Sequence, residues 1–138
     1  MIEAFSQVNW PAVIVASIAH FALGGVWFMA LFGKQYALAL GIADRAPQKP
    51  GLLFIVGPFV CSALNIATTA LLLRALGIAN YGDALLLGLV VGVGYLVAMT
   101  VNIAINPLFP RPFQYALINA PMFVIGSLMS CVILVAMS

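Results

Sequence analysis

Residues 10–32 read WPAVIVASIAHFALGGVWFMALF, a stretch without Asp, Glu, Lys or Arg. At about 1.5 Å of rise per residue, a helix of this length crosses the roughly 30 Å of hydrocarbon in a bilayer. His20 is the one ionisable side chain within it. The stretch therefore predicts a membrane-spanning helix whose side chains are surrounded by lipid.

The composition agrees with a membrane protein over the whole chain. Of the 138 residues, 65% are hydrophobic and only 6% are charged, whereas a soluble domain carries about 25% charged residues. So few charges cannot cover the surface of a soluble domain. The net charge of +2 gives no indication of nucleic-acid binding, and none is expected. Cys61 and Cys131 lie in apolar runs and are interpreted as packing residues.

Three further apolar stretches follow the first one. We expect four spans at about residues 10–32, 52–76, 84–105 and 114–137. The connections between them are short, so consecutive helices are expected to be antiparallel neighbours. The sequence thus predicts an all-α integral membrane protein, a four-helix antiparallel bundle that forms a single domain over residues 1–138.

Two segments that follow spans resemble one another. Residues 31–38 read LFGKQYAL and residues 108–117 read LFPRPFQYAL. The span after each segment carries a proline about two turns in, Pro58 or Pro121. The likeness reflects either two parallel helical hairpins related by an axis along the membrane normal or chance similarity between two loops that anchor the same side of the bundle.

The lysines and arginines predict the orientation, because loops on the cytoplasmic side carry an excess of them. The loops after the first and third spans hold Lys34, Arg45, Lys49 and Arg111, whereas the opposite side holds Arg74. We therefore expect a multi-pass protein of the bacterial inner membrane with both termini on the outer, periplasmic side. Four residues are expected to contact lipid headgroups or a partner: Trp10, Trp27, Lys34 and Arg111.

Small residues indicate where helices pack closely. Ala84, Gly88 and Gly92 recur every four residues in the third span, which lets the backbone of a neighbouring helix approach. Gly24 and Gly25 are expected to do the same in the first span. The predicted packing residues are these five.

One polar side chain in each span falls near the middle of the bilayer. Counted from the outer end of each span, His20, Asn65, Tyr95 and Ser127 all lie about 15 Å deep. They form the candidate midplane site. In the second span, Asn65 belongs to a polar stripe that is expected to face other helices: Ser62, Asn65, Thr68 and Thr69.

The midplane site has two interpretations. In the functional one, His20 carries a proton or ligates a group, with Asn65 and Tyr95 as its partners. In the structural one, the four side chains form a hydrogen-bond network that holds the helices together. The spans hold no deep carboxylate, which a proton-coupled carrier typically uses.

The chain also resembles a known family over nearly its whole length. The resemblance lies in NW at 9–10, GG at 24–25, WF at 27–28 and LFGK at 31–34, and later in LFPRP at 108–112 and LINA at 117–120. These segments are similar to the bacterial membrane family catalogued as domain of unknown function 1761, with Phe28 where that family usually has Tyr. The resemblance implies a four-helix inner-membrane protein and carries no known activity or catalytic residue.

These observations lead to three functional hypotheses. The first is a non-enzymatic membrane protein that acts through helix–helix contacts, as an accessory or scaffold subunit or as a homo-oligomer. Its partners would be lipids and other membrane subunits or further copies of itself. The second is a minimal dimeric transporter or channel with a midplane site at His20. The third is a subunit that binds a pigment or haem through His20.

Enzymatic and metal sites are not predicted. The chain contains no nucleophile–base–acid set that would form a catalytic site. One histidine and two apolar cysteines do not make a metal-ligand set. Apart from the pigment or haem alternative at His20, no cofactor is predicted.

Overall fold

The structure, a computed structural model, describes residues 2–46 and 49–138. Within these residues the chain forms helices and no β-strand. Four helical stretches are long and apolar enough to cross a membrane: Trp10–Leu31, Leu53–Ala75, Tyr81–Ala104 and Pro112–Ala136. The predicted all-α membrane fold with four spans is therefore confirmed.

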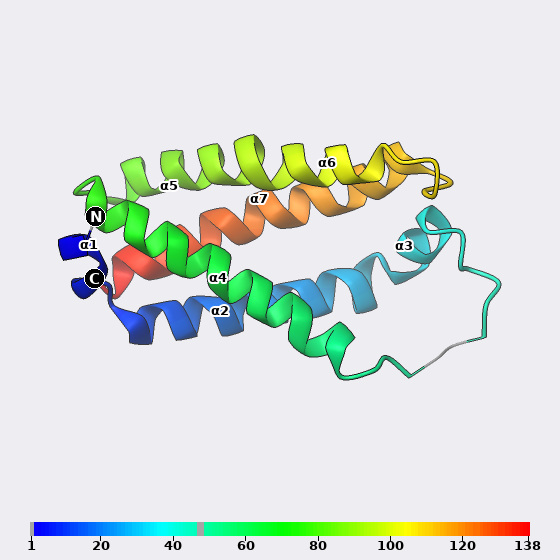
Figure 1. Ribbon diagram of the computed structural model, residues 1–138, viewed down its shortest axis with the longest axis horizontal. Helices are drawn as coiled ribbons and strands as arrows, with labels where there is room; N and C mark the ends of the chain where they lie inside the picture. The colour runs from blue at the N-terminus through cyan, green and yellow to red at the C-terminus, as the bar shows by residue number, and fades with distance from the viewer. Residues whose placement is uncertain (1, 47–48) are drawn as a thin grey trace.

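The four spans are built from seven of the nine helical elements (Figure 1). The first span is α2 (Trp10–Gly25) with η1 (Val26–Leu31), and the second is α4 (Leu53–Ala75). The third is α5 (Tyr81–Leu89), η2 (Val90–Val97) and α6 (Ala98–Ala104), and the fourth is α7 (Pro112–Ala136). The short helices α1 (Ile2–Ser6) and α3 (Gly33–Ala39) lie at opposite ends of the bundle, and both chain ends lie at the α1 end (Figure 1).

The third span begins at Tyr81, earlier than its apolar run suggests, because Asn80 and Asp83 cap it. The Asn80 side-chain oxygen accepts the Asp83 backbone N–H at 2.9 Å, and the Asn80 amide donates to the Asp83 carboxylate at 2.7 Å. This reciprocal pair satisfies a helix donor that would otherwise be unpaired.

Two of the spans change from α-helical to π-helical hydrogen bonding along their length. In η1 the Phe32 N–H donates to the carbonyl oxygen of Trp27, five residues earlier, at 2.9 Å. At the end of η2 the Ala98 N–H reaches the carbonyl of Val93 in the same way. The wider turn changes the direction in which later side chains point, and π-turns are frequent at functional sites.

Helix α7 lies at the centre of the bundle. It packs against α2, α3, α4, α5, η2 and α6. In the most apolar 18-residue stretch of α7, 50% is buried. The corresponding share is 17% for α4 and 28% or less for the other two spans. Helix α4 is the least covered span, because it packs mainly on α2.

The third span approaches the backbone of α7 at two glycines. A Cβ atom placed on Gly88 would lie 3.2 Å from the Leu128 Cα, and one on Gly92 would lie 3.2 Å from the Val124 Cα. Ala84, one turn earlier, is fully buried. The Ala84, Gly88 and Gly92 ridge thus faces α7, where side chains larger than these would separate the two helices.

The two neighbouring glycines of the first span differ from one another. A Cβ on Gly24 would lie 3.0 Å from the Met122 Cε of α7, whereas a Cβ on Gly25 would have no atom within 4 Å. Gly25 therefore does not act as a packing residue in this structure. Consecutive helix residues point about 100° apart, so adjacent glycines cannot both face the same neighbour.

The largest apolar cluster lies in the half of the bundle that holds the chain ends. It joins residues from α2, α4, α5 and α7, together with Val8 before α2. Its buried members are Val8, Ala12, Val13, Ala16, Ile66, Ala70, Leu73, Ala84, Cys131, Leu134 and Val135. Small side chains dominate this cluster, so the helices lie close together there.

We predict that Gly88→Leu and Gly92→Leu each destabilise the protein by about 1–3 kcal/mol. The new side chain meets backbone atoms of α7, which cannot move aside as a flexible side chain can. The measurement is the midpoint of thermal unfolding in mild detergent. Gly94→Leu is the matched control, because a Cβ there has no atom within 4 Å. Equal midpoints for all three variants would contradict the close contact.

Candidate functional site

The structure does not bring the four residues of the predicted midplane site together. His20 and Ser127 are buried, with 7% and 6% of their surface exposed. Asn65 is exposed, and Tyr95 is 71% exposed. Depth along a helix gives the height of a side chain in the bilayer but not the direction in which it points. His20 and Ser127 lie in helix interfaces, whereas Asn65 and Tyr95 lie on the outer surface.

The polar stripe of the second span is likewise turned only partly inward. Thr69 is buried and Ser62 is half-buried, whereas Asn65 and Thr68 are exposed. The Thr69 and Thr68 hydroxyls donate to carbonyl oxygens four residues earlier in α4, both at 2.9 Å. A hydroxyl satisfied by its own helix does not need to face another helix, which is why the stripe did not predict the buried side of α4.

The His20 ring packs against α7 at Gly126. A Cβ atom on Gly126 would lie 2.5 Å from the imidazole Cε1 and 2.7 Å from Nδ1. Only glycine leaves room for the ring at this position. The imidazole therefore fills the interface between α2 and α7, with its contact made to main-chain atoms.

The Nδ1 atom of His20 is buried and has no hydrogen-bond partner within the part of the chain that the structure describes. The hydroxyls one turn away along each helix, those of Ser17 and Ser130, are already engaged. Ser17 donates to the Val13 carbonyl at 2.7 Å, and Ser130 donates to the Gly126 carbonyl at 2.7 Å. A buried polar atom without a partner costs about 1–3 kcal/mol, so His20 is the polar group of this interface that is left unsatisfied.

Most other polar groups in the spans bond to their own helix. Thr100 donates to the Leu96 carbonyl at 2.7 Å, and Asn119 donates to the Tyr115 carbonyl at 2.7 Å. Ser127 differs, because its hydroxyl crosses to α5 and donates to the Gly88 carbonyl at 2.9 Å. The described polar side chains thus make local bonds and isolated links between helices rather than one network.

Trp27 makes a second link between helices. It is half-buried, and its indole Nε1 donates to the Ile118 carbonyl of α7 at 2.9 Å. Pro121 lies just after this carbonyl, and a proline in a helix disturbs the backbone bonding of the preceding turn. Trp27 therefore contacts α7, in contrast to the expected headgroup contact, whereas Trp10 is 42% exposed and packs edge-on against Phe5.

An aromatic cluster holds α3 on the bundle. Ring centroids are 4.9 Å apart for Phe28 and Tyr36, 5.7 Å for Tyr36 and Tyr115, and 4.8 Å for Tyr115 and Phe109. Burial raises the pKa of Tyr36, and the Tyr115 phenol adds to the rise, so the Tyr36 hydroxyl stays protonated at neutral pH. Tyr36 and Tyr115 belong to the two similar segments of sequence, and the repeat itself stays a prediction.

Lys34 and Arg111 are both exposed at the end of the bundle that holds α3. Lys34 lines a wide, shallow recess with Gly33, Ala37 and Leu38. The Arg111 Nη1 reaches only the Gln114 side-chain oxygen, at 3.5 Å. Both cations are therefore accessible to headgroups.

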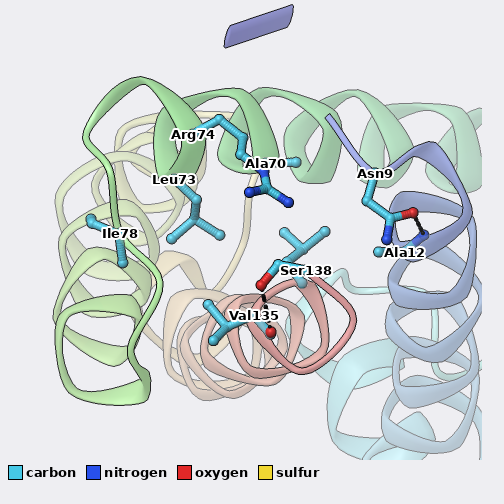
Figure 2. Close-up of a pocket in the computed structure, with 9 residues that line it drawn as sticks. Asn9, Ala12, Ala70, Leu73, Arg74, Ile78, Val135 and Ser138 are labelled. Carbon is cyan, nitrogen blue, oxygen red and sulfur yellow. Dashed lines mark hydrogen bonds between the residues drawn. The ribbon is translucent and has the colours of Figure 1, made fainter. Parts of the chain in front are cut away.

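A small pocket opens at the opposite end, between α2, α4 and α7 (Figure 2). Its volume of about 20 Å³ is enough for roughly one water molecule. The Arg74 guanidinium extends from α4 over this pocket toward Ser138 (Figure 2). Asn9 closes one side, since its amide donates to the Met137 carbonyl at 2.5 Å and its oxygen accepts the Ala12 N–H at 3.2 Å. A pocket of this size suits a water or a single headgroup oxygen rather than a substrate.

The described part of the chain, residues 2–46 and 49–138, contains no cluster of metal-binding side chains. No three His, Cys, Asp or Glu side chains lie close enough there to hold an ion. Cys61 is exposed and Cys131 is buried, and both are free thiols.

Comparison with known proteins identifies the family. The model of a family described as "Protein of unknown function (DUF1761)" matches residues 11–135. The chain belongs to the DUF1761 family. The resemblance seen in the first and last spans is thereby confirmed. No curated protein and no solved structure matches the chain.

We predict that Gly126→Ala destabilises this DUF1761 protein by about 1–3 kcal/mol, because the methyl group overlaps the His20 ring. Adding His20→Ala should recover part of the loss, since the ring is then gone and the two effects are not additive. Thermal unfolding of the single and double variants in detergent measures both effects.

The control for this pair is Gly94→Ala in η2. A Cβ on Gly94 has no atom within 4 Å, and alanine is the better helix former. We expect its unfolding midpoint to be unchanged or raised. A Gly126→Ala midpoint equal to that of the wild type would contradict the His20–Gly126 contact.

Proposed function

We propose that this DUF1761 protein is a non-enzymatic membrane subunit that works through helix–helix contacts with a further subunit. The observation that carries this proposal is the exposed carboxamide of Asn65 on α4. Among the hydrogen bonds of the described chain, Asn65 contributes its backbone carbonyl, which accepts from Thr69, and its side chain takes part in none. The Asn65 side-chain amide therefore has no hydrogen-bond partner in the described chain and faces the surroundings of the helix.

The position of Asn65 makes this exposure costly. It lies near the middle of the span Leu53–Ala75, about 15–18 Å from either end. Hydrocarbon offers the carboxamide no partner, and transfer of an unpaired amide into an apolar medium costs roughly 2–7 kcal/mol. A neighbouring helix that supplies a hydrogen bond at this depth removes most of that cost.

The packing of α4 leaves room for such a neighbour. Only 17% of its most apolar 18-residue stretch is buried, which is the lowest share among the four spans. Leu64, next to Asn65, is 64% exposed. A second membrane helix can lie along this side of α4 without displacing any part of the bundle.

The chemistry of the interior supports a role in packing over a role in catalysis. The buried hydroxyls of Ser17, Thr69 and Ser130 donate to carbonyls of their own helices. The Ser127 hydroxyl and the Trp27 indole join helices to each other. Groups used in this way stabilise the fold and are not free to act on a substrate.

The second candidate function is a minimal dimeric transporter or channel, and the buried, unpartnered Nδ1 of His20 favours it. An imidazole in this state is available to take or pass on a proton. Against this, the ring faces main-chain atoms of Gly126 at close contact, where an ion path or a haem group would need open space. The pigment or haem alternative is supported least for the same reason.

We also propose that the α3 end of the bundle faces the cytoplasm of a bacterial cell. Lys34 lies in α3, Arg45 and Lys49 lie in the connection between α3 and α4, and Arg111 lies just before α7; all four are exposed. Arg74 lies at the end with the chain termini, in the pocket of Figure 2. The excess of positive charge supports this orientation.

The test of the proposed function is the mass of the assembly in mild detergent and its dependence on Asn65. We expect an assembly larger than one chain, and we expect Asn65→Leu to raise the dissociation constant of the assembly about fivefold, as loss of roughly 1 kcal/mol at a hydrogen-bonded contact would produce. Light scattering coupled to size exclusion measures both quantities.

Asn102→Leu is the control, because it removes another exposed carboxamide, one that lies two residues before the end of α6 rather than near the middle of α4. It should leave the assembly unchanged. A wild-type protein that is monomeric both in detergent and in native vesicles would refute the proposed function. A proton flux into vesicles that is lost in His20→Ala would favour the transporter instead.

A further inference from the structure

We propose that the subunit bound by α4 is a second copy of the same chain, docked about a two-fold axis along the membrane normal. This inference rests on the proposed function and names its partner. The contact is made by one side of α4, which we term the α4 face: Gly57, Cys61, Leu64, Asn65 and Thr68. Steps of three and four residues place these positions on one side of a helix.

The α4 face has no close neighbour among the residues that the structure describes, 2–46 and 49–138. Cys61, Leu64, Asn65 and Thr68 are exposed, and a Cβ on Gly57 would have no atom within 4 Å. Three of the buried residues of α4 lie on the opposite side of the helix, where α2 packs: Ile66, Ala70 and Leu73. Buried Thr69, four residues after Asn65, lies between the two sides. The helix therefore has one occupied face and one open face.

The shape of the α4 face suits a close contact between helices. Gly57, Cys61 and Thr68 are small, and they follow one another along the same side of the helix. Small residues let two membrane helices approach until their backbones are in van der Waals contact. Leu64 beside them provides an apolar side chain that can pack against the approaching helix.

The chemistry of Asn65 points to a second copy as the occupant. A carboxamide carries both a donor and an acceptor, so two carboxamides can satisfy each other. Copies inserted in the same direction hold Asn65 at the same depth, and a two-fold axis along the membrane normal brings the two side chains face to face. Each Nδ2 then donates to the Oδ1 of the other copy, and no further chemistry is required.

Charge does not oppose this pairing. Arg74 is the one charged residue in α4, and it lies in the last turn of the helix, away from the α4 face. Two identical faces without charge can meet in hydrocarbon, whereas a charged face would repel its own copy. The α4 face is therefore self-complementary in shape, in hydrogen bonding and in charge.

The native cysteines provide the experiment. Cys61 lies on the α4 face one turn before Asn65, whereas Cys131 is fully buried. In the proposed dimer the two Cys61 residues face each other at equal depth, within reach of a disulfide. Purified protein in liposomes, at high lipid-to-protein ratio, is treated with a membrane-permeant oxidant. We expect a disulfide-linked dimer that is abolished by Cys61→Ser and retained by Cys131→Ser.

Two matched controls separate a specific contact from random collision. In a Cys61→Ser background, Tyr95→Cys places a thiol at an equally lipid-exposed site on η2, away from the α4 face, and it should not cross-link. Asn65→Leu should reduce the Cys61 cross-link at least about fivefold, whereas Asn102→Leu should not change it. Equal cross-linking through Tyr95→Cys would indicate collision and overturn the inference.

Counting of fluorophore bleaching steps in the same liposomes gives an independent result, which does not depend on cysteine geometry. Two steps per particle, reduced to one by Asn65→Leu, are expected. Single steps for the wild type would overturn the inference. If the assembly from native membranes is nevertheless larger, depends on Asn65 and contains another protein, the proposed function stands and the second-copy inference fails. If neither assembly forms, both fail.

Discussion

Hydrocarbon neither donates nor accepts a hydrogen bond, and the placement of the buried hydroxyl groups in the described spans reflects that constraint. Four buried hydroxyls donate hydrogen bonds to carbonyl oxygens of their own helices: those of Ser17, Thr69, Thr100 and Ser130. These bonds cost the helices little and leave nothing unpaired. The Ser127 hydroxyl and the Trp27 indole instead form hydrogen bonds between helices.

The links between helices converge on α7. The Ser127 hydroxyl reaches the Gly88 carbonyl, and the Trp27 indole reaches the Ile118 carbonyl next to the turn that Pro121 disturbs. Gly88 and Gly92 let the third span lie against the α7 backbone on one side, and the aromatic cluster ties α3 to it on another. Helix α4 takes little part in this arrangement, which is why its outer side stays exposed.

Much of the architecture follows from the sequence alone, because long apolar runs in lipid have one stable solution. The number of spans, their approximate limits and the small-residue ridge at Ala84, Gly88 and Gly92 could all be inferred before the structure. These inferences use length and spacing along the chain. They need no knowledge of which side of a helix faces a neighbour.

The direction of individual side chains could not be inferred with the same success. The spans are apolar on all sides, so no amphipathic pattern indicates which side of α4 or η2 is buried. Counting at α-helical pitch also fails where η1 and η2 adopt wider turns, for which the sequence offers no signal beyond nearby glycines. Asn65 and Tyr95 therefore point outward despite their depth, and Trp27 points inward despite its place near the end of a span.

The contact between His20 and Gly126 links two positions that lie far apart in the chain. The imidazole occupies the volume that any side chain at residue 126 would need. A methyl group at the position of Gly126 displaces the His20 ring, and a shorter residue at the position of His20 relieves that overlap. The two sites are therefore expected to evolve as a pair, and histidine should be inherited only together with glycine across this interface.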